Sequence, residues 1–574
     1  MNTRHFGGAI ALALVEWGSP GGAATVMPWR RIGGVTWIAT ARPEAFAALI
    51  PSFPESFGQV RMLLCGEDQI QAAILAVRRI AMIRQAETRV PAAESCRSRN
   101  EARTGRIAMG LMAALALGLW LVPVFVLSAL TLWATASLVA QSGLKLAALI
   151  ASRRTEAEGR ALAEDVAQGR RARTEMTGPL PVISVMVPLF RESDVAGKLV
   201  GRLSRLDYPR ELTDILLVIE ASDQVTRNAI QGARLPGWIR VVEVPNGPVQ
   251  TKPRALNYAL NFCRGAIIGV WDAEDRPDPD QLHKVARRFH FAPDDVACLQ
   301  GALDYYNPRT NWLARCFTIE YAAWFRVILP GVARLGLVVP LGGTTLFFRR
   351  DALEQVGAWD AWNVTEDADL GVRLARRGWR TEIIDTTTDE EANCRALPWI
   401  KQRSRWLKGY AMTWGVHMRD PRALWRDLGP RRFIGFQVQF LGSLTQYLLA
   451  PILWSFWLLT LGLGWALFWL VSPASIVWAI VYYGASIGGQ HSATIGMRMM
   501  DLELRTWYGA RGYFVLGATH AVLFWVTISF LSPLVLLVGL LNGRRRLLHD
   551  IILGTVIINS SVRTQVSPAA RASY

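Results

Sequence analysis

The sequence has few cysteines, and none of them forms a closely spaced pair. Its six cysteines stand at positions 65, 96, 263, 298, 316 and 394, without a Cys-x-x-Cys motif. We therefore expect reduced thiols facing the cytoplasm, with no disulfide framework and no cysteine-ligated metal site. Signatures of zinc fingers, homeodomains and RNA-recognition modules are also missing, so the net charge of +17 does not point to a nucleic acid partner.

Charged residues are almost absent from three stretches, Ile107–Ser152, Phe433–Gln490 and Tyr513–Leu541. The first contains one charged residue, Lys145, while the second has 58 residues and the third 29 residues without any. A helix needs about 20 apolar residues to cross a bilayer. The first stretch therefore predicts a helical hairpin that turns near Pro123, and the other two predict several spans or interfacial helices.

These stretches divide the chain into five parts. We expect a small cytoplasmic domain over 1–103, a transmembrane hairpin over 104–152, a soluble domain over 178–420, transmembrane or interfacial helices over 430–545 and a tail over 546–574. Arg153 and Arg154 directly follow the hairpin, as the positive-inside rule expects of a cytoplasmic exit. The sequence thus predicts a multi-pass protein of a bacterial-type cytoplasmic (inner) membrane, with the soluble domain in the cytoplasm.

The soluble domain alternates strand and helix patterns. Strand-like runs cover 182–188, 214–219, 239–244 and 266–270, and helical patterns lie around 194–206, 223–232 and 252–263. This order predicts an α/β fold, a parallel sheet with helices on both faces that binds ligands beyond the carboxyl ends of its strands. Glu220, Asp223 and Asp272 fall just past such strand ends.

The acidic turn Asp272-Ala273-Glu274-Asp275 follows the fourth strand. Neighbouring carboxylates repel each other unless a divalent cation lies between them, and Mg²⁺ or Mn²⁺ prefers oxygen ligands. The turn therefore predicts a site for a metal ion and a diphosphate. A solvated turn before Pro277 is the alternative interpretation.

A basic helix start is found at Gln250 to Asn257. Pro253 is tolerated in a first helical turn, and a helix N-terminus that carries Lys252 and Arg254 suits a phosphate-rich ligand. Ordinary surface charge is the alternative.

The sequence Thr365-Glu366-Asp367 could supply a general base. Inverting sugar transfer needs one carboxylate to take the proton of the attacking hydroxyl. The alternative is structural, because Thr365 could cap a helix over Ala368–Arg376.

The motif Gln402-x-x-Arg405-Trp406 places three side chains on one helix face. An aromatic ring suits the apolar face of a sugar, and an arginine can hold phosphate. A juxtamembrane amphipathic helix would have the same composition.

In this order, the motifs resemble family 2 glycosyltransferases of the cellulose, chitin and hyaluronan synthase type over residues 180–420. The resemblance implies a GT-A domain inserted between transmembrane segments, with Asp367 as the catalytic base. The donor contacts that it implies are Glu220, Asp223, Lys252, Asp272, Gln402 and Arg405. The implied metal ligands are Asp272 and Glu274, the latter at a position that is usually Asp, and the implied acceptor contacts are Gly343, Thr344, Glu366 and Trp406.

The N-terminal part has a weaker resemblance. A strand over Val35–Ala39 after a Gly-Gly turn and a helix over Asp68–Arg79 resemble the later half of the small α+β N-terminal domain of type II secretion ATPases. Some relatives bind cyclic di-GMP through an Arg-Leu-Gly repeat that this sequence lacks. Cyclic di-GMP and other export subunits remain open as partners, and a small docking domain is the alternative.

We expect a membrane glycosyltransferase that uses a UDP-sugar to elongate and export a β-linked polysaccharide. A PilZ signature and the Phe-x-Val-Thr-x-Lys segment of bacterial cellulose synthases are missing, so cellulose itself is not indicated. One alternative is a non-processive transferase to a lipid acceptor, diacylglycerol or polyprenyl phosphate. Another is a catalytically dispensable membrane component of an export or phage-uptake machine.

Overall fold

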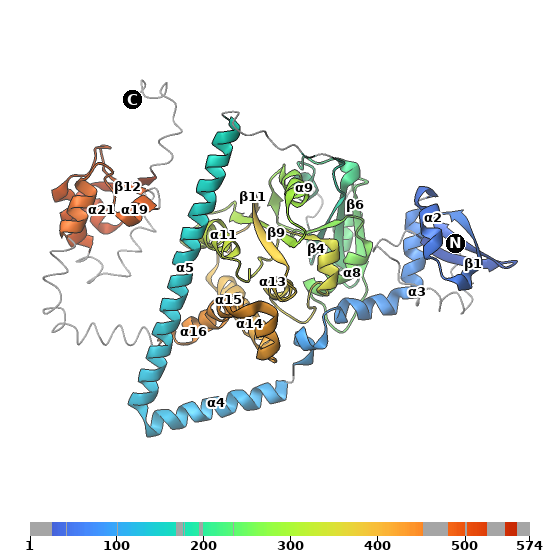
Figure 1. The fold of residues 1–574 in the computed structure, drawn as a ribbon, viewed down its shortest axis with the longest axis horizontal. Coiled ribbons are helices and arrows are strands. Elements are labelled where there is room, and N and C mark those ends of the chain that lie inside the picture. Colours follow the sequence, from blue (N-terminus) through green and yellow to red (C-terminus); the bar gives the residue numbers. More distant parts are fainter. Residues whose placement is uncertain are drawn as a thin grey trace. The chain divides into compact units, whose positions relative to one another are not determined.

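The chain forms two compact units, Met1–Ala450 and Pro451–Tyr574. The structure is a computed structural model and describes residues 26–41, 43–99, 101–167, 176, 178–193, 199–232, 235–451, 480–499, 502–524 and 546–559. Figure 1 shows that the first unit holds a small N-terminal sheet, two long helices and a central domain. The predicted boundary at residue 430 falls inside this first unit, which continues to Ala450.

The N-terminal part consists of a three-stranded sheet and a long helix, α3. Its elements are β1 (Val26–Ile32), β2 (Val35–Thr40), α2 (Pro43–Leu49), β3 (Gln59–Leu64) and α3 (Glu67–Thr88). The strand predicted over Val35–Ala39 is therefore confirmed as β2, which pairs antiparallel with β1 and parallel with β3. The glycines of the turn, Gly33 and Gly34, have φ of 56° and 79°, a region that favours glycine.

Two long apolar helices follow, α4 (Glu101–Leu121) and α5 (Pro123–Ala167). They meet at Val122, beside the proline at which the sequence predicts the turn. Large apolar side chains lie exposed along both, with Trp120 79% and Phe125 74% exposed. Among the residues that the structure describes, three segments are long and apolar enough to cross a membrane: Ala102–Leu121, Pro123–Thr155 and Trp312–Arg334. Such surface and length are typical of a membrane protein.

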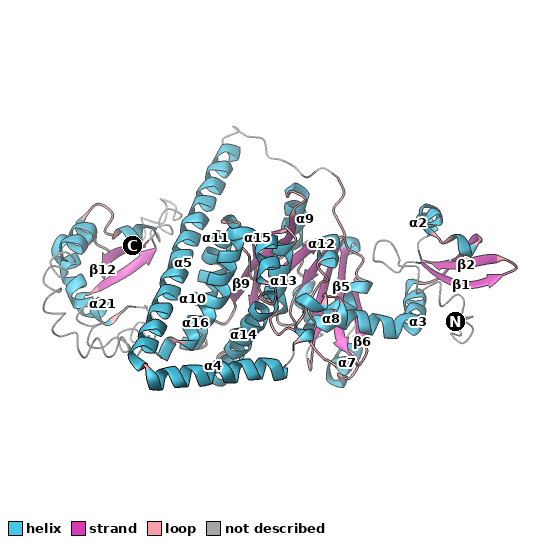
Figure 2. Cartoon of the chain, turned by 60° about the horizontal axis from the view of Figure 1, so that its bottom comes forward, coloured by secondary structure: helices cyan, strands magenta, loops and turns pink. Residues whose placement is uncertain are grey.

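An eight-stranded mixed sheet forms the centre of the first unit (Figure 2). Its strand order is β6-β5-β4-β7-β10-β9-β11-β8. The strands are β4 (Ile183–Leu189), β5 (Thr213–Glu220), β6 (Ile239–Val244), β7 (Ile267–Val270), β8 (Arg276–Pro277), β9 (Val296–Tyr305), β10 (Leu346–Arg349) and β11 (Arg380–Glu390). The four predicted strands are β4 to β7, and they pair parallel as expected.

The prediction of a parallel sheet is wrong for the other half of the domain. Strand β10 runs antiparallel to both of its neighbours, β7 and β9, and β8 runs antiparallel to β11. A buried strand has the same apolar pattern in either direction, so the sequence pattern could not reveal this reversal.

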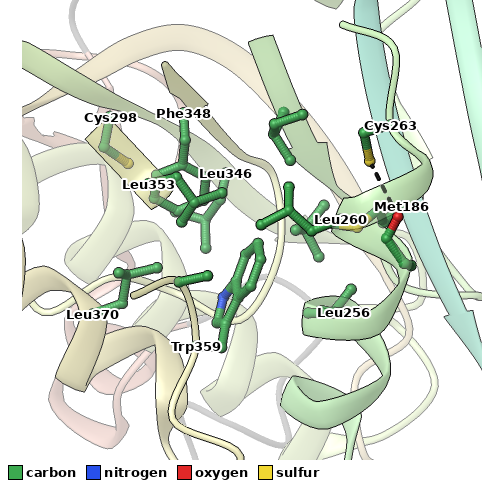
Figure 3. Close-up of a cluster of buried hydrophobic side chains, with 14 of the residues drawn as sticks. Met186, Leu256, Leu260, Cys263, Cys298, Leu346, Phe348, Leu353, Trp359 and Leu370 are labelled. Atoms are coloured by element: carbon green, nitrogen blue, oxygen red, sulfur yellow. Dashed lines mark hydrogen bonds between the residues drawn. The ribbon is translucent and has the colours of Figure 1, made fainter. Parts of the chain in front are cut away.

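Helices cover both faces of the sheet. Successive residues of a strand point to opposite faces, so each strand contributes to an apolar cluster on either side. Val185 and Val187 pack with one apolar cluster, whereas Met186 belongs to the other. The helices are α6 (Val200–Leu203), α7 (Gln224–Gln231), α8 (Lys252–Ala259), α9 (Gln281–Phe291), α10 (Trp312–Ala323), α11 (Leu329–Arg334), α12 (Arg350–Gln355), α13 (Glu366–Arg376), α14 (Ala396–His417), α15 (Pro421–Phe436) and α16 (Gly442–Leu448). In Figure 3, Trp359 lies between side chains of α8 and Leu370 of α13.

Helix α5 is attached to the central domain through α11. A Cβ on Gly331 would lie 1.9 Å from the carbonyl oxygen of Ala148, so only glycine allows the two backbones to approach this closely. Arg334 and Glu158 form an ion pair of 2.8 Å across the same contact. The apolar segment Trp312–Arg334, which the sequence assigns to the soluble domain, thus packs beside a long apolar helix.

The second unit contains α19 (Ile495–Met499), β12 (Leu502–Thr506), α21 (Leu548–Leu553) and β13 (Thr555–Asn559). Strands β12 and β13 pair antiparallel. The predicted tail over 546–574 therefore begins too early, because its first residues form a helix and a strand. The predictions of spans over 452–479 and 525–545 lie outside the described residues.

Candidate active site

Lys252, the first residue of α8, joins two of the predicted site segments. Its Nζ donates to Asp272 Oδ1 at 2.5 Å and to the carbonyl oxygen of Gly343 at 2.8 Å. Burial alone would lower the pKa of Lys252, but the carboxylates of Asp272, Asp367 and Glu366 outweigh it and raise the pKa above its usual value. The ammonium is therefore held charged between the acidic turn and the start of α13.

The acidic turn holds Asp275 more deeply than the two predicted metal ligands. Asp275 is 1% exposed, and its Oδ2 accepts hydrogen bonds from the backbone N–H of Asp272 and the hydroxyl of Thr344. Its other oxygen, Oδ1, has no hydrogen-bond partner among the described residues. Thr344, predicted to contact the acceptor, is thus turned towards an acid of the proposed metal site.

Four carboxyl groups repel one another at this end of the sheet. The pKa values of Asp275 and Glu390 are raised well above their usual range, in both cases by burial first. The pKa of Glu274 is also raised, by partial burial and by Asp272. Since Lys252 is the ammonium bound to Asp272, a divalent cation would relieve the remaining repulsion. The unbound Oδ1 of Asp275 gives the cluster a ligand atom, so these residues fit a metal ion.

The two acids that begin α13 lie beside this cluster. Glu366 is 7% and Asp367 6% exposed, and Asp367 Oδ1 accepts a hydrogen bond of 3.2 Å from Trp359 Nε1. Burial, and then the charge of Glu366, raise the pKa of Asp367 well above its usual range. A Cβ on Gly343 would lie 3.7 Å from Asp367 Oδ2, so Asp367 adjoins the turn that binds Lys252. A general base is most effective when its pKa lies near the working pH.

The predicted helix cap by Thr365 is wrong. Thr365 occupies the N-cap position of α13, but its side chain makes no capping hydrogen bond, and its buried hydroxyl has no partner among the described residues. It packs instead against α14, where a Cβ on Gly409 would lie 2.2 Å from the hydroxyl oxygen. Close packing between the two helices therefore takes the place of the cap.

A buried network fixes α13 further along its length. Asp369 Oδ2 accepts from Arg373 Nε at 2.7 Å, and Asp369 Oδ1 lies 3.1 Å from His417 Nε2 of α14. Burial would raise the pKa of Asp369, yet Arg373 and His417 hold it below its usual value. The helix that carries Asp367 is thus tied to the helix that carries Arg405.

The three residues of the Gln402-x-x-Arg405-Trp406 motif lie on helix α14 in different surroundings. Gln402 Oε1 accepts from Asn393 Nδ2 at 3.4 Å, and Trp406 packs against Phe317, with ring centroids 6.1 Å apart. Arg405 is exposed; burial raises the pKa of Glu366, and the charge of Arg405 is one of those that oppose this shift. Leu397, at the start of the helix, is 72% exposed.

Glu220 and Asp223, two of the implied donor contacts, are the candidates for binding the nucleobase of the donor. They differ in whether a carboxylate oxygen is left without a partner among the described residues. Asp223 caps α7: it accepts from the N–H of Thr226 at 3.2 Å, from the Thr226 hydroxyl at 2.7 Å and from the N–H of Arg191 at 2.6 Å. Glu220 Oε2 accepts from Arg254 at 3.4 Å, while Oε1 is buried without a partner among the described residues. Burial raises the pKa of Glu220 to about 7, although Arg254 opposes the shift. Glu220 is therefore the one of the two with an oxygen left for a ligand.

Three residues of the site were missed by the sequence analysis: Asp275, Glu390 and Trp359. Asp275 belongs to a motif that was recognised, and Glu390 ends β11, so the rule that ligands lie past strand ends could have found it. Trp359 precedes α13 in an irregular segment and gave no signal in the sequence.

Comparisons with known proteins indicate the families that parts of the chain resemble. Residues 180–409 match the family described as "Glycosyltransferase like family 2", and residues 431–554 match the RDD family. A beta-monoglucosyldiacylglycerol synthase of Synechocystis sp. is 31% identical over 240 residues, which cover 41% of this chain and 48% of the relative. Glucomannan 4-beta-mannosyltransferase 7 of Arabidopsis thaliana is 22% identical over 242 residues, 40% of this chain and 43% of the relative.

A solved mannosyltransferase of Pyrobaculum calidifontis, in complex with GDP-Man and Mn²⁺, is 18% identical with a TM-score of 0.38 and covers 57% of this chain and 93% of its own. The chain spans about half the length of the curated relatives that it matches. The family match and the mixed sheet together assign the GT-A-like fold to the central domain. Residues 180–409 are therefore a glycosyltransferase domain of family 2.

Proposed function

We propose that the chain is a membrane-embedded, inverting glycosyltransferase that transfers a sugar from a UDP-sugar to a growing β-linked glycan. One observation carries the proposal: Lys252 binds Asp272 at 2.5 Å and also donates to the carbonyl oxygen of Gly343, the residue beside Asp367, so a single ammonium links the donor acids to the turn that adjoins the candidate catalytic base. The family match supports sugar transfer, and the long apolar helices support a membrane location. The bacterial-type inner membrane and the cytoplasmic placement of the domain belong to the same proposal.

Asp367 would act on the acceptor. Its carboxylate takes the proton of the attacking hydroxyl while that oxygen forms a bond to the anomeric carbon, and the bond from this carbon to the diphosphate breaks on the opposite side. The electron pair of that bond leaves with UDP. Trp359 Nε1 holds one oxygen of Asp367, which leaves Oδ2 for the hydroxyl.

The charge of the departing diphosphate would be opposed by Lys252 and Arg405. Preorganised positive groups stabilise charge that develops in a transition state. Glu220 would accept a hydrogen bond from the base of the nucleotide through Oε1, which is buried and free of other partners among the described residues.

Mg²⁺ or Mn²⁺ would be held by Asp272, Glu274 and Asp275, with Glu390 next to them. When bound, the ion neutralises the diphosphate and the surrounding carboxylates. The orphaned Oδ1 of Asp275 and the raised pKa values of the cluster support this assignment.

A growing glycan is the acceptor that we favour. Trp406 and Tyr321, which are both partly exposed, offer aromatic surface near the site, and the apolar stretches on both sides of the domain suit export of the product. A lipid acceptor, diacylglycerol, is the second candidate, because a relative at 31% identity is a beta-monoglucosyldiacylglycerol synthase. The N-terminal part would be a domain similar to the N-terminal domain of type II secretion ATPases, and a small docking domain is the alternative.

Membranes that contain the chain, incubated with radiolabelled UDP-sugars and Mg²⁺ or Mn²⁺, test the proposal. Label in a polymer that linkage-specific hydrolases degrade supports glycan synthesis. Label that partitions into the organic phase identifies the lipid acceptor instead. If no UDP-sugar is turned over, and a variant with Asp367→Asn supports the same cellular phenotype as the wild type, the chain acts as a non-catalytic membrane component.

A further inference from the structure

The last turn of α3 lies outside residues 180–409 and yet contacts the transferase domain through buried polar groups. Arg254 Nε donates to Glu87 Oε1 at 3.1 Å, and Asn257 Nδ2 donates to the carbonyl oxygen of Ala86 at 2.9 Å. Trp362 Nε1 donates to the carbonyl oxygen of Glu87 at 3.1 Å. Two of these three partners belong to α8, the helix that begins with Lys252.

The first contact, between Glu87 and Arg254, leads to Glu220, the residue proposed to bind the nucleobase of the donor. The Arg254 side chain is 0% exposed, and a buried guanidinium is costly unless a carboxylate and hydrogen bonds surround it. Glu87 supplies that carboxylate on one side of the guanidinium, and Glu220 Oε2 accepts on the other side at 3.4 Å. The carbonyl oxygen of Pro245 accepts from Arg254 Nη2 at 2.6 Å. Arg254 thus holds Glu220 in place, and Glu87 holds Arg254.

The second contact leads to the candidate catalytic base. Asn257, which bonds Ala86, also donates from Nδ2 to the carbonyl oxygen of Trp359 at 2.7 Å and accepts from the N–H of Trp359 at 3.1 Å. The indole of Trp359 is fully buried and donates to Asp367. Figure 3 shows this indole packed in the apolar cluster beside Leu256 of α8 and Leu260, which follows that helix. Direct contacts therefore run from one helical turn to both ends of the site.

The chain that follows α3 is fastened to the same domain. Ser95 Oγ and the N–H of Cys96 both donate to the carboxylate of Asp360, at 2.8 and 2.7 Å. The end of α3 is thus held firmly in register, which a positioning contact requires.

We propose that Glu87 is a positioning residue of the transferase site, which orients Glu220 through Arg254 and so sets the affinity for the nucleotide of the donor. The inference rests on the proposed function, because it takes a nucleoside diphosphate as the ligand near Glu220. Loss of the carboxylate leaves the buried guanidinium free to draw Glu220 away from the pocket. The chemistry at Asp367 is reached through the main chain of Ala86 and is not altered by this change.

Glu87→Gln in the full-length protein tests the inference. We expect the KM for the UDP-sugar and the Kd for UDP in the presence of Mn²⁺ to rise about tenfold, because a neutral amide no longer balances the charge of the buried guanidinium, while kcat stays within about twofold. Glu87→Asp keeps the charge but shortens the side chain, so its KM should lie between that of the wild type and that of Glu87→Gln. A merely structural role would lower the active fraction and hence the apparent kcat, leaving KM unchanged.

Glu94→Gln is the matched control. Its side chain is 15% exposed against 11% for Glu87, and it also pairs with an arginine, but it contacts the far end of α13. We expect this variant to keep the wild-type KM and Kd. A Kd for UDP within twofold of wild type in Glu87→Gln, or an equal rise in Glu94→Gln, would overturn the inference. A wild-type protein that binds no UDP at all would instead refute the proposed function.

Discussion

Replacement of Asp367 by Asn removes the candidate base with little change in shape. The amide oxygen of Asn can still accept the hydrogen bond that Trp359 Nε1 donates at 3.2 Å. The variant also removes a buried negative charge beside Glu366, so we expect the melting temperature to stay the same or to rise.

The expected loss of rate follows from the role of the carboxylate. A positioned general base contributes roughly 10²–10⁴-fold, so kcat should fall by that factor. Binding of UDP should change by less than about threefold, because Lys252 binds Asp272 and Gly343 and keeps both contacts. The loss should therefore appear in kcat and kcat/KM together, as for an interaction used only in the transition state.

The assay measures UDP release from the UDP-sugar and the acceptor that membranes use best, with UDP affinity measured in parallel. Asp351→Asn, an exposed carboxylate of α12 in the same domain, is the control and should keep full activity. If Asp367→Asn retained more than a tenth of the wild-type kcat, Asp367 would not be the base.

Further predictions concern pH, metal and stability. Because burial and Glu366 raise the pKa of Asp367, the acid limb of kcat/KM should lie well above the value of about 4 that an ordinary aspartate gives, with activity lost as pH falls. Chelation of divalent cations should abolish turnover, and Asp275→Asn should raise the Mn²⁺ concentration for half-maximal activity at least tenfold, whereas the exposed Asp280→Asn should not. Asp369→Asn should lower the free energy of unfolding by about 3–5 kcal/mol, read from denaturant unfolding, because it strands the fully buried Arg373. Since the pKa of Asp369 is lowered in the fold, its stabilising contribution is present above the usual aspartate pKa and is lost as pH falls through the lowered value.

Much of the parallel half of the domain could be predicted from the sequence. Mostly apolar runs located β4, β5 and β7, since a strand buried on both faces has few polar positions. The edge strand β6 includes Arg240 and Glu243, and it matches its predicted range of 239–244. The acids that follow strand ends were also recognised, because parallel strands bring their carboxyl ends to one edge of the sheet. The structure brings Lys252, Asp272, Gly343 and Asp367 together in one place.

Other features depend on contacts between distant segments and leave no local pattern. The antiparallel direction of β10 is decided by its neighbours in the sheet. Thr365 has the right residue type for a helix cap, but its side chain packs against Gly409 and makes no capping hydrogen bond. The bond between Glu87 and Arg254 joins residues 167 positions apart, and a single sequence cannot reveal it.

The contact between α3 and α8 has a consequence for where the smallest functional piece of this protein begins. The family match starts at residue 180, but a recombinant fragment cut there would lose Glu87 and Ala86. Arg254 would then lie in the interior without Glu87, and Asn257 would lose one of its two carbonyl partners. The folding unit thus starts before Ala86, on the other side of two long apolar helices.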